Sequence, residues 1–190
     1  MKSKTILKKI TIVVVPTLLA FLYITQFGPS NEAEAPILSK YGLDNLSVKE
    51  MVNKLDSNID KIPGLNATIT GMTLILNENE VEYDYTLPSD EFYVSVAPYI
   101  NEVHPCKTHN LVSCRGEIFN KEFEVSIVRE DGIVILSQKA KSMNSGFIGL
   151  WLPKGIEAIL TIKYNGLSVA QPISTFDNSD TCITTPLKLS

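Results

Sequence analysis

Hydrophobic residues follow two different periods along the chain. Between Ser47 and Leu55 they recur every three or four positions, which predicts one amphipathic helix of about three turns. Ser47 and Glu50 at its start have the spacing of a capping box, in which each side chain satisfies a backbone N–H of the other residue. From Ile69 onward hydrophobic and polar residues alternate, which is typical of strands with one buried face. The pattern therefore predicts a helix followed by sheet.

Turn signals divide the alternating region into strands. Asn77 to Asn79 separates two predicted strands, and Asp131-Gly132 and Asn165-Gly166 have the composition of hairpin turns. The predicted strands of the first half are 69–76, 80–86 and 92–96. Those of the second half are 123–127, 133–136, 147–152, 159–164, 167–170, 173–176 and 182–187. About seven strands with regular turns are typical of a small β-sandwich.

The predicted fold class is α+β and mainly β, with a small N-terminal unit of helix and strands followed by a C-terminal antiparallel β-sandwich. We expect residues 1–35 to be a secretion signal and residues 36–100 to form the helix-plus-sheet unit. Residues 101–190 would then form a cysteine-containing loop and the β-sandwich, as a metal-binding domain. Phe147 and Trp151 are expected to fill the sandwich core.

The N-terminal segment has the pattern of a bacterial secretion signal. Four lysines precede an apolar stretch from Ile10 to Phe27, and Ala33-Glu34-Ala35 supplies small residues at cleavage spacing. Pro36 is unfavourable directly after a cleavage site, so retention of the segment as a membrane tether is the alternative to a cleaved, exported product. The predicted location is the periplasm, where disulfides can form.

The charge of the chain excludes one class of partner. The formal net charge is −4, and the N-terminal segment carries four of the lysines, so the remainder is more acidic still. Such a chain lacks the basic surface that nucleic acid or an anionic membrane requires. No phosphate-binding glycine loop, Cys-x-x-Cys pair or nucleophile elbow occurs, so we predict no enzyme, apart from a thiol-dependent redox reaction.

The chain has only three cysteines and two histidines, and most of them are clustered in the sequence. Cys106 lies between His104 and His109, Cys114 follows shortly after, and Cys182 lies near the C-terminus. Three cysteines can form only one disulfide, so an oxidised protein keeps one thiol free. Thiols and imidazoles concentrated in this way indicate a site for a thiophilic metal ion.

The same segments resemble the CueP family of periplasmic copper-binding proteins. The resemblance covers roughly residue 41 to the C-terminus and rests mainly on the cysteine spacing. The motifs that carry it are His104-Pro-Cys106, Cys114, Gly116-Glu117, the run from Gly146 to Pro153, and Thr181-Cys-Ile-Thr-Thr185. The resemblance implies a periplasmic protein that binds copper and serves copper resistance, with the three cysteines as its metal and redox site.

We predict that Cys106, Cys114 and Cys182 bind Cu(I), a soft ion that tolerates few ligands. His109 is a further candidate ligand, because it lies three residues from Cys106. His104 is a weaker candidate, or orients a thiolate. The same sulfurs with one histidine would also make a Cys₃His zinc site, so zinc remains an alternative.

Two other functions remain open from the sequence. The thiols could reduce Cu(II) or exchange disulfides with a partner, or a disulfide could merely staple an interaction module that binds no metal. The bridges considered are Cys114–Cys182 and Cys106–Cys114. Cys114 precedes the first predicted sandwich strand and Cys182 lies in the last, which favours Cα atoms within the disulfide range of about 7 Å. The expected partners are a copper ion, periplasmic thiol–disulfide oxidoreductases or copper-receiving proteins, and, as an alternative, a second copy of the chain.

Overall fold

The computed structural model describes residues 36–58 and 62–190. The predicted secretion signal lies outside these residues. Helix α2 (Pro36–Lys40) belongs to a first unit that ends at Gly42, and the second unit comprises Leu43–Ser190. Within the described part of the chain, no helix is both long and apolar enough to cross a membrane.

Helix α3 (Val48–Ser57) opens the second unit and has the predicted capping box. The Ser47 backbone N–H donates to Glu50 Oε2 at 2.8 Å, and the Glu50 N–H donates to Ser47 Oγ at 3.4 Å. Three hydrophobic side chains of the helix are buried, and so is one carboxylate: Met51, Val52, Leu55 and Asp56. A buried aspartate on an apolar helix face requires partners, and strands of two different sheets provide them.

The first sheet is antiparallel in the order β3-β2-β1-β5. Its strands are β1 (Leu65–Ile69), β2 (Thr73–Glu78), β3 (Val81–Thr86) and β5 (His109–Asn110). The single strand predicted over 69–76 is wrong, because a turn interrupts it. The Thr70 hydroxyl accepts the backbone N–H of Met72 at 3.3 Å and that of Thr73 at 3.0 Å, which closes this turn. The hairpin predicted between β2 and β3 is confirmed.

The second sheet is antiparallel in the order β10-β9-β6-β7. Its strands are β6 (Glu122–Arg129), β7 (Val134–Lys141), β9 (Glu157–Tyr164) and β10 (Leu167–Ser174). Asn165 and Gly166 join β9 to β10 with φ angles of 50° and 80°, so both residues adopt the left-handed conformation of the predicted tight turn. The hairpin predicted at Asp131-Gly132 is also confirmed, between β6 and β7.

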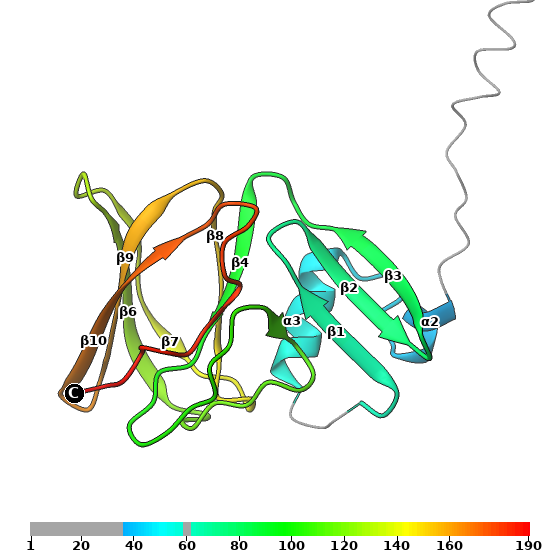
Figure 1. The fold of residues 1–190 in the computed structure, drawn as a ribbon, viewed down its shortest axis with the longest axis horizontal. Helices are drawn as coiled ribbons and strands as arrows, with labels where there is room; N and C mark the ends of the chain where they lie inside the picture. Colours follow the sequence, from blue (N-terminus) through cyan, green and yellow to red (C-terminus); the bar gives the residue numbers. More distant parts are fainter. Residues whose placement is uncertain (1–35, 59–61) are drawn as a thin grey trace, which may run out of the picture. The chain divides into compact units, whose positions relative to one another are not determined.

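The third sheet, in the order β11-β4-β8, connects the two halves of the sequence. Its strands are β4 (Glu91–Val96), β8 (Ile148–Pro153) and β11 (Cys182–Ile183). Strand β4 pairs with two strands of the second half rather than with the N-terminal strands, contrary to the predicted grouping of residues 92–96 (Figure 1). The last strand is shorter than predicted, since the Leu187 N–H donates to the Thr184 carbonyl at 2.9 Å and turns the chain.

The second and third sheets share one hydrophobic core, so the fold is mainly β as predicted. Both sheets contribute alternate buried side chains, among them Phe92, Val94, Phe123, Val125, Leu150, Leu152, Leu160 and Ile162. Trp151 does not belong to this core, contrary to expectation. Its indole N–H donates to Asn53 Oδ1 of α3 at 3.3 Å, and its ring contacts Tyr93. Phe147 is buried in a separate small cluster with Ala97 and Cys182.

Candidate metal centre

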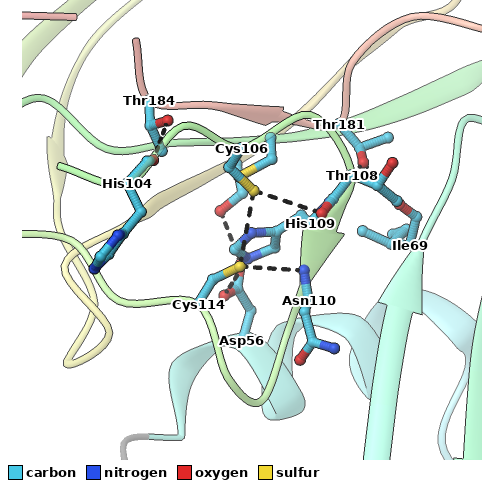
Figure 2. Close-up of a disulfide and its surroundings, with 12 residues drawn as sticks. Asp56, Ile69, His104, Cys106, Thr108, His109, Asn110, Cys114, Thr181 and Thr184 are labelled. Atoms are coloured by element: carbon cyan, nitrogen blue, oxygen red, sulfur yellow. Dashed lines mark hydrogen bonds and ion pairs between the residues drawn. A yellow bond between two sulfur atoms is a disulfide. The ribbon is translucent and has the colours of Figure 1, made fainter.

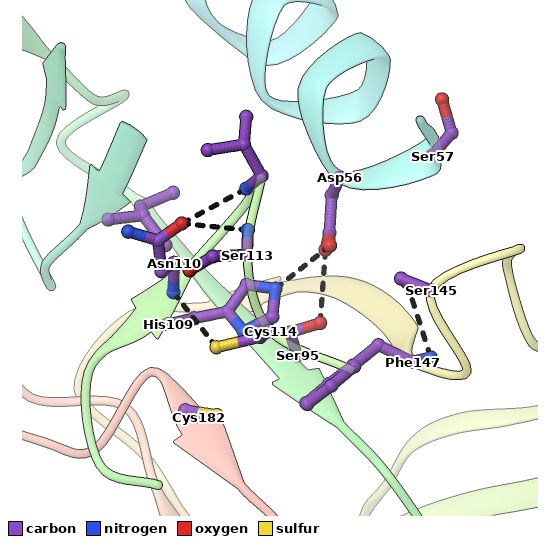
Figure 3. Close-up of polar contacts among 12 residues, drawn as sticks. Asp56, Ser57, Ser95, His109, Asn110, Ser113, Cys114, Ser145, Phe147 and Cys182 are labelled. Carbon is purple, nitrogen blue, oxygen red and sulfur yellow. Dashed lines mark hydrogen bonds and ion pairs between the residues drawn. The ribbon is translucent and has the colours of Figure 1, made fainter. Parts of the chain in front are cut away.

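Four side chains from separate segments bring their donor atoms together. The sulfurs of Cys106, Cys114 and Cys182 and a ring nitrogen of His109 all lie within 4.8 Å of one another. Cys106 lies in the loop before β5, His109 in β5 and Cys114 in the turn after it (Figure 2). Cys182 lies in β11 (Figure 3). The segment predicted as a loop thus places Cys106, His109 and Cys114 beside Cys182.

Two of the three sulfurs are joined as a disulfide. Cys106 and Cys182 form the bridge, with a Cα–Cα distance of 5.4 Å and a sequence separation of 76 residues, and Cys114 is free. This pairing is neither of those considered from the sequence, although the free third thiol is confirmed. The reason is the path of the loop, because the Cys182 N–H donates to the Lys107 carbonyl at 3.0 Å and holds the segment around Cys106 beside β11.

Cys114 is held close to the disulfide by a tight turn. Its backbone N–H donates to the Asn110 carbonyl at 3.1 Å, and the Asn110 side-chain oxygen accepts the N–H groups of Val112 and Ser113. Its sulfur lies 3.8 Å from Cys106 Sγ and accepts the Asn110 N–H at 3.4 Å. Burial alone would raise the pKa of the Cys114 thiol, but the adjacent His109 imidazole and this N–H stabilise the thiolate and lower it.

His109 is fully buried and paired with an acidic side chain from α3. Its Nε2 lies 2.8 Å from Asp56 Oδ1, with the two side chains 0% and 1% exposed (Figure 3). Burial alone would lower the pKa of His109, but Asp56 and the Cys114 sulfur favour the imidazolium and raise it to about 9. The imidazole also packs against Phe147, with ring centroids 4.6 Å apart.

One atom of the cluster has no protein partner in the described residues. His109 Nδ1 is buried and makes no hydrogen bond. A buried polar atom without a partner costs free energy, and such atoms are frequent where a ligand binds. Once the disulfide is reduced, the donor set of three sulfurs and this nitrogen would fit a thiophilic ion.

Two further findings concern residues outside the four. His104 is exposed and absent from the cluster; its carbonyl accepts the Thr184 hydroxyl at 2.7 Å, and its side chain points away from the sulfurs in Figure 2. Sequence reasoning missed Asp56. The available signal was its position directly after Leu55 on the apolar face of the predicted helix, where a carboxylate needs a buried partner.

The geometry defines a mainly β protein with a partly buried cluster of three cysteines and one histidine that could hold a metal ion. Residues 50–187 match the model of the family described as periplasmic copper-binding protein CueP, and the chain belongs to this family. A solved structure described as the crystal structure of S.CueP is 38% identical, with a TM-score of 0.79. The match covers 83% of this chain and 98% of that one. Among curated proteins, none matched the chain.

Proposed function

We propose that the reduced protein sequesters Cu(I) through Cys106, Cys114 and Cys182, with His109 Nδ1 as a fourth donor, and so contributes to copper resistance. The observation that supports this proposal is the convergence of three sulfurs and a buried, unpartnered nitrogen within 4.8 Å. Thiolates bind Cu(I) in preference to hard cations, and a site partly shielded from solvent limits redox cycling of the ion.

The spacing of the sulfurs is suited to a bound ion. Metal–sulfur bonds of about 2.3 Å in a trigonal or tetrahedral site require sulfurs about 4 Å apart. Cys106 Sγ and Cys114 Sγ are already 3.8 Å apart. Zinc in a Cys₃His site would need nearly the same spacing, so distance alone does not select copper; the family does, since it is described as copper-binding.

The disulfide makes the capacity of this site depend on its redox state. While Cys106 and Cys182 are bonded to each other, neither offers a thiolate, and only Cys114 and His109 remain as donors. Reduction by two electrons releases two further thiolates. A periplasmic thiol–disulfide oxidoreductase would supply these electrons, and a copper-receiving protein would take the ion from the loaded site.

The disulfide also favours a second candidate function, the reduction of Cu(II). In that reaction the two thiols of Cys106 and Cys182 give one electron each to two Cu(II) ions. The products are two Cu(I) ions, one disulfide and two protons, and the disulfide is the bond present in the structure. Both functions use one site, because Cu(I) formed there could be held by Cys114 and His109.

Internal disulfide exchange is less well supported. An attacking sulfur must lie nearly in line with the bond that breaks. Cys114 Sγ in line beyond Cys106 would be about 5.8 Å from Cys182 Sγ, given a bond of about 2.0 Å. The observed separation is at most 4.8 Å, so the three sulfurs form a triangle, which suits shared binding of one ion.

Titration with Cu(I) tests the main proposal. Reduced protein should bind one Cu(I), and Cys→Ser substitution at 106, 114 or 182 should each weaken binding by at least about tenfold. His104→Gln is the matched control, because this histidine lies outside the cluster. Unchanged affinity after Cys114→Ser and Cys182→Ser would contradict the three-sulfur site. Counting thiols before and after addition of Cu(II) separates the second function, since a reductant loses two thiols for every two Cu(I) formed.

A further inference from the structure

We propose that Asp56 positions His109 for metal binding, by holding the Nε2–H group so that Nδ1 faces the sulfurs. This inference rests on the proposed copper function, and it gives helix α3 a role in a site whose ligands all lie in β5, β11 and the loops beside them. Asp56 is a positioning residue, since none of its atoms belongs to the four-residue donor cluster.

The contact between the two side chains determines which nitrogen is available. Asp56 Oδ1 lies 2.8 Å from His109 Nε2. A carboxylate can only accept, so Nε2 carries a hydrogen, and Nδ1 is the nitrogen that can release its proton and offer a lone pair to a metal. This is the atom that is buried without a protein partner. Figure 3 shows Asp56 on one side of the imidazole and the Cys114 sulfur on the other. The ring thus presents its unpaired nitrogen on the side of the sulfurs.

Asp56 is itself held in one orientation by strand β4. The hydroxyls of Tyr93 and Ser95 both donate to Oδ2, at 2.5 Å and 3.0 Å, which leaves Oδ1 to His109. Burial raises the pKa of Tyr93 well above its usual value, with Asp56 adding to the effect, so the phenol remains a donor. Ser95 also lies opposite Cys182 in the pairing of β4 with β11. Strand β4 therefore supports the proposed site in two ways. Its edge pairs with β11, which carries Cys182, and two of its side chains hold Asp56 against His109.

The substitution Asp56→Asn separates this role from simple packing. The amide has the same shape, and its oxygen would stay at the Oδ2 position to accept the Tyr93 and Ser95 hydroxyls. Its NH₂ group would then face Nε2 and can only donate. Nε2 would have to accept, the ring hydrogen would move to Nδ1, and the metal would lose this donor.

The experiment uses the reduced full-length protein and Cu(I) itself. We expect Asp56→Asn to weaken Cu(I) binding about 10- to 100-fold, whereas Asp90→Asn, a loss of the same charge at an exposed position, should leave it unchanged. In the His109→Gln background, Asp56→Asn should have little further effect, because it acts through the imidazole. An effect of the same size in both backgrounds, or none in the first, would overturn the proposal.

A spectroscopic measurement tests the assignment of the nitrogen independently of affinity. In ¹⁵N-labelled, Cu(I)-loaded wild type, His109 Nε2 should retain a bonded hydrogen and Nδ1 should not. A hydrogen on Nδ1 would refute the proposal. If Asp56→Asn does not fold, as circular dichroism would show, Tyr93→Phe replaces it and should weaken binding by a smaller factor, while unchanged binding would count against the proposal. Failure of wild type to bind Cu(I) through its thiolates would refute the copper function instead.

Discussion

Replacement of His109 by glutamine should lower the free energy of unfolding of the oxidised protein, and this difference from wild type should vanish at high pH. Glutamine can still donate a hydrogen bond to Asp56 Oδ1 but carries no charge. The variant therefore leaves the buried carboxylate and the Cys114 thiolate without their cationic partner. His104→Gln is a close control, because the only other histidine of the chain is exposed and outside the cluster.

The structure gives both the size and the pH dependence of this effect. The pKa of His109 is raised from 6.5 to about 9 by Asp56 and Cys114 against the opposing effect of burial. At about 1.4 kcal/mol per pKa unit, the imidazolium stabilises the folded state by about 3 kcal/mol. A pKa that is higher in the folded state gives stability that is complete below pH 6.5 and is lost as the pH rises through about 9.

Urea unfolding of the disulfide-intact proteins measures this contribution. At about pH 6 we expect the variant to be about 3 kcal/mol less stable than wild type, and at about pH 10 the two free energies of unfolding should nearly converge. His104→Gln should follow wild type throughout. A difference that is equally large at both pH values would show that His109 acts through packing against Phe147, and a difference below about 1 kcal/mol at the lower pH would refute the charged pair.

Three further predictions follow from the same region. Cys114, which is free in the structure, should react with iodoacetamide with a pH midpoint below that of an ordinary thiol. His109→Gln should move this midpoint upward, because the imidazolium lowers the pKa of Cys114. An unmoved midpoint would contradict this cause. Gly149→Ala should lower the free energy of unfolding by about 1–3 kcal/mol, since a Cβ there would collide with the Tyr93 hydroxyl; thermal unfolding checks it, and an unchanged unfolding midpoint would contradict the clash. Reduction of wild type should raise its Cu(I) affinity, measured by competition with a chelator, and the double variant Cys106→Ser, Cys182→Ser should abolish this dependence because it cannot form an internal bridge.

Much of the fold and the members of the cluster could be predicted because the signals are local. The Ser47 capping box and the Asn165-Gly166 turn depend on residues adjacent in sequence, and both are present. The grouping of soft ligands around Cys106 likewise required only their spacing. Composition alone also shows that one thiol stays free.

The remaining features depend on contacts between distant segments. The disulfide partner of Cys106 follows from β11 pairing in parallel with β4, which no turn signal indicates. The Asp56–His109 pair joins residues 53 positions apart. Trp151 alternates correctly along its strand, but the strand has α3 on one side, so the predicted core lies on the other face of the sheet. Periodicity identifies a buried face without identifying what buries it.

The long loop closed by the disulfide makes the stability of the protein differ between its oxidised, its copper-bound and its reduced, metal-free states. Cys106 and Cys182 close a loop of 76 residues, and a link of that length removes about 4 kcal/mol of chain entropy from the unfolded state. A Cu(I) ion held by the same two sulfurs would close the same loop. The disulfide and the bound metal would then stabilise the fold in the same way, and only the reduced, metal-free form would lack both cross-links. This form should therefore unfold most readily and be the most readily degraded by proteases.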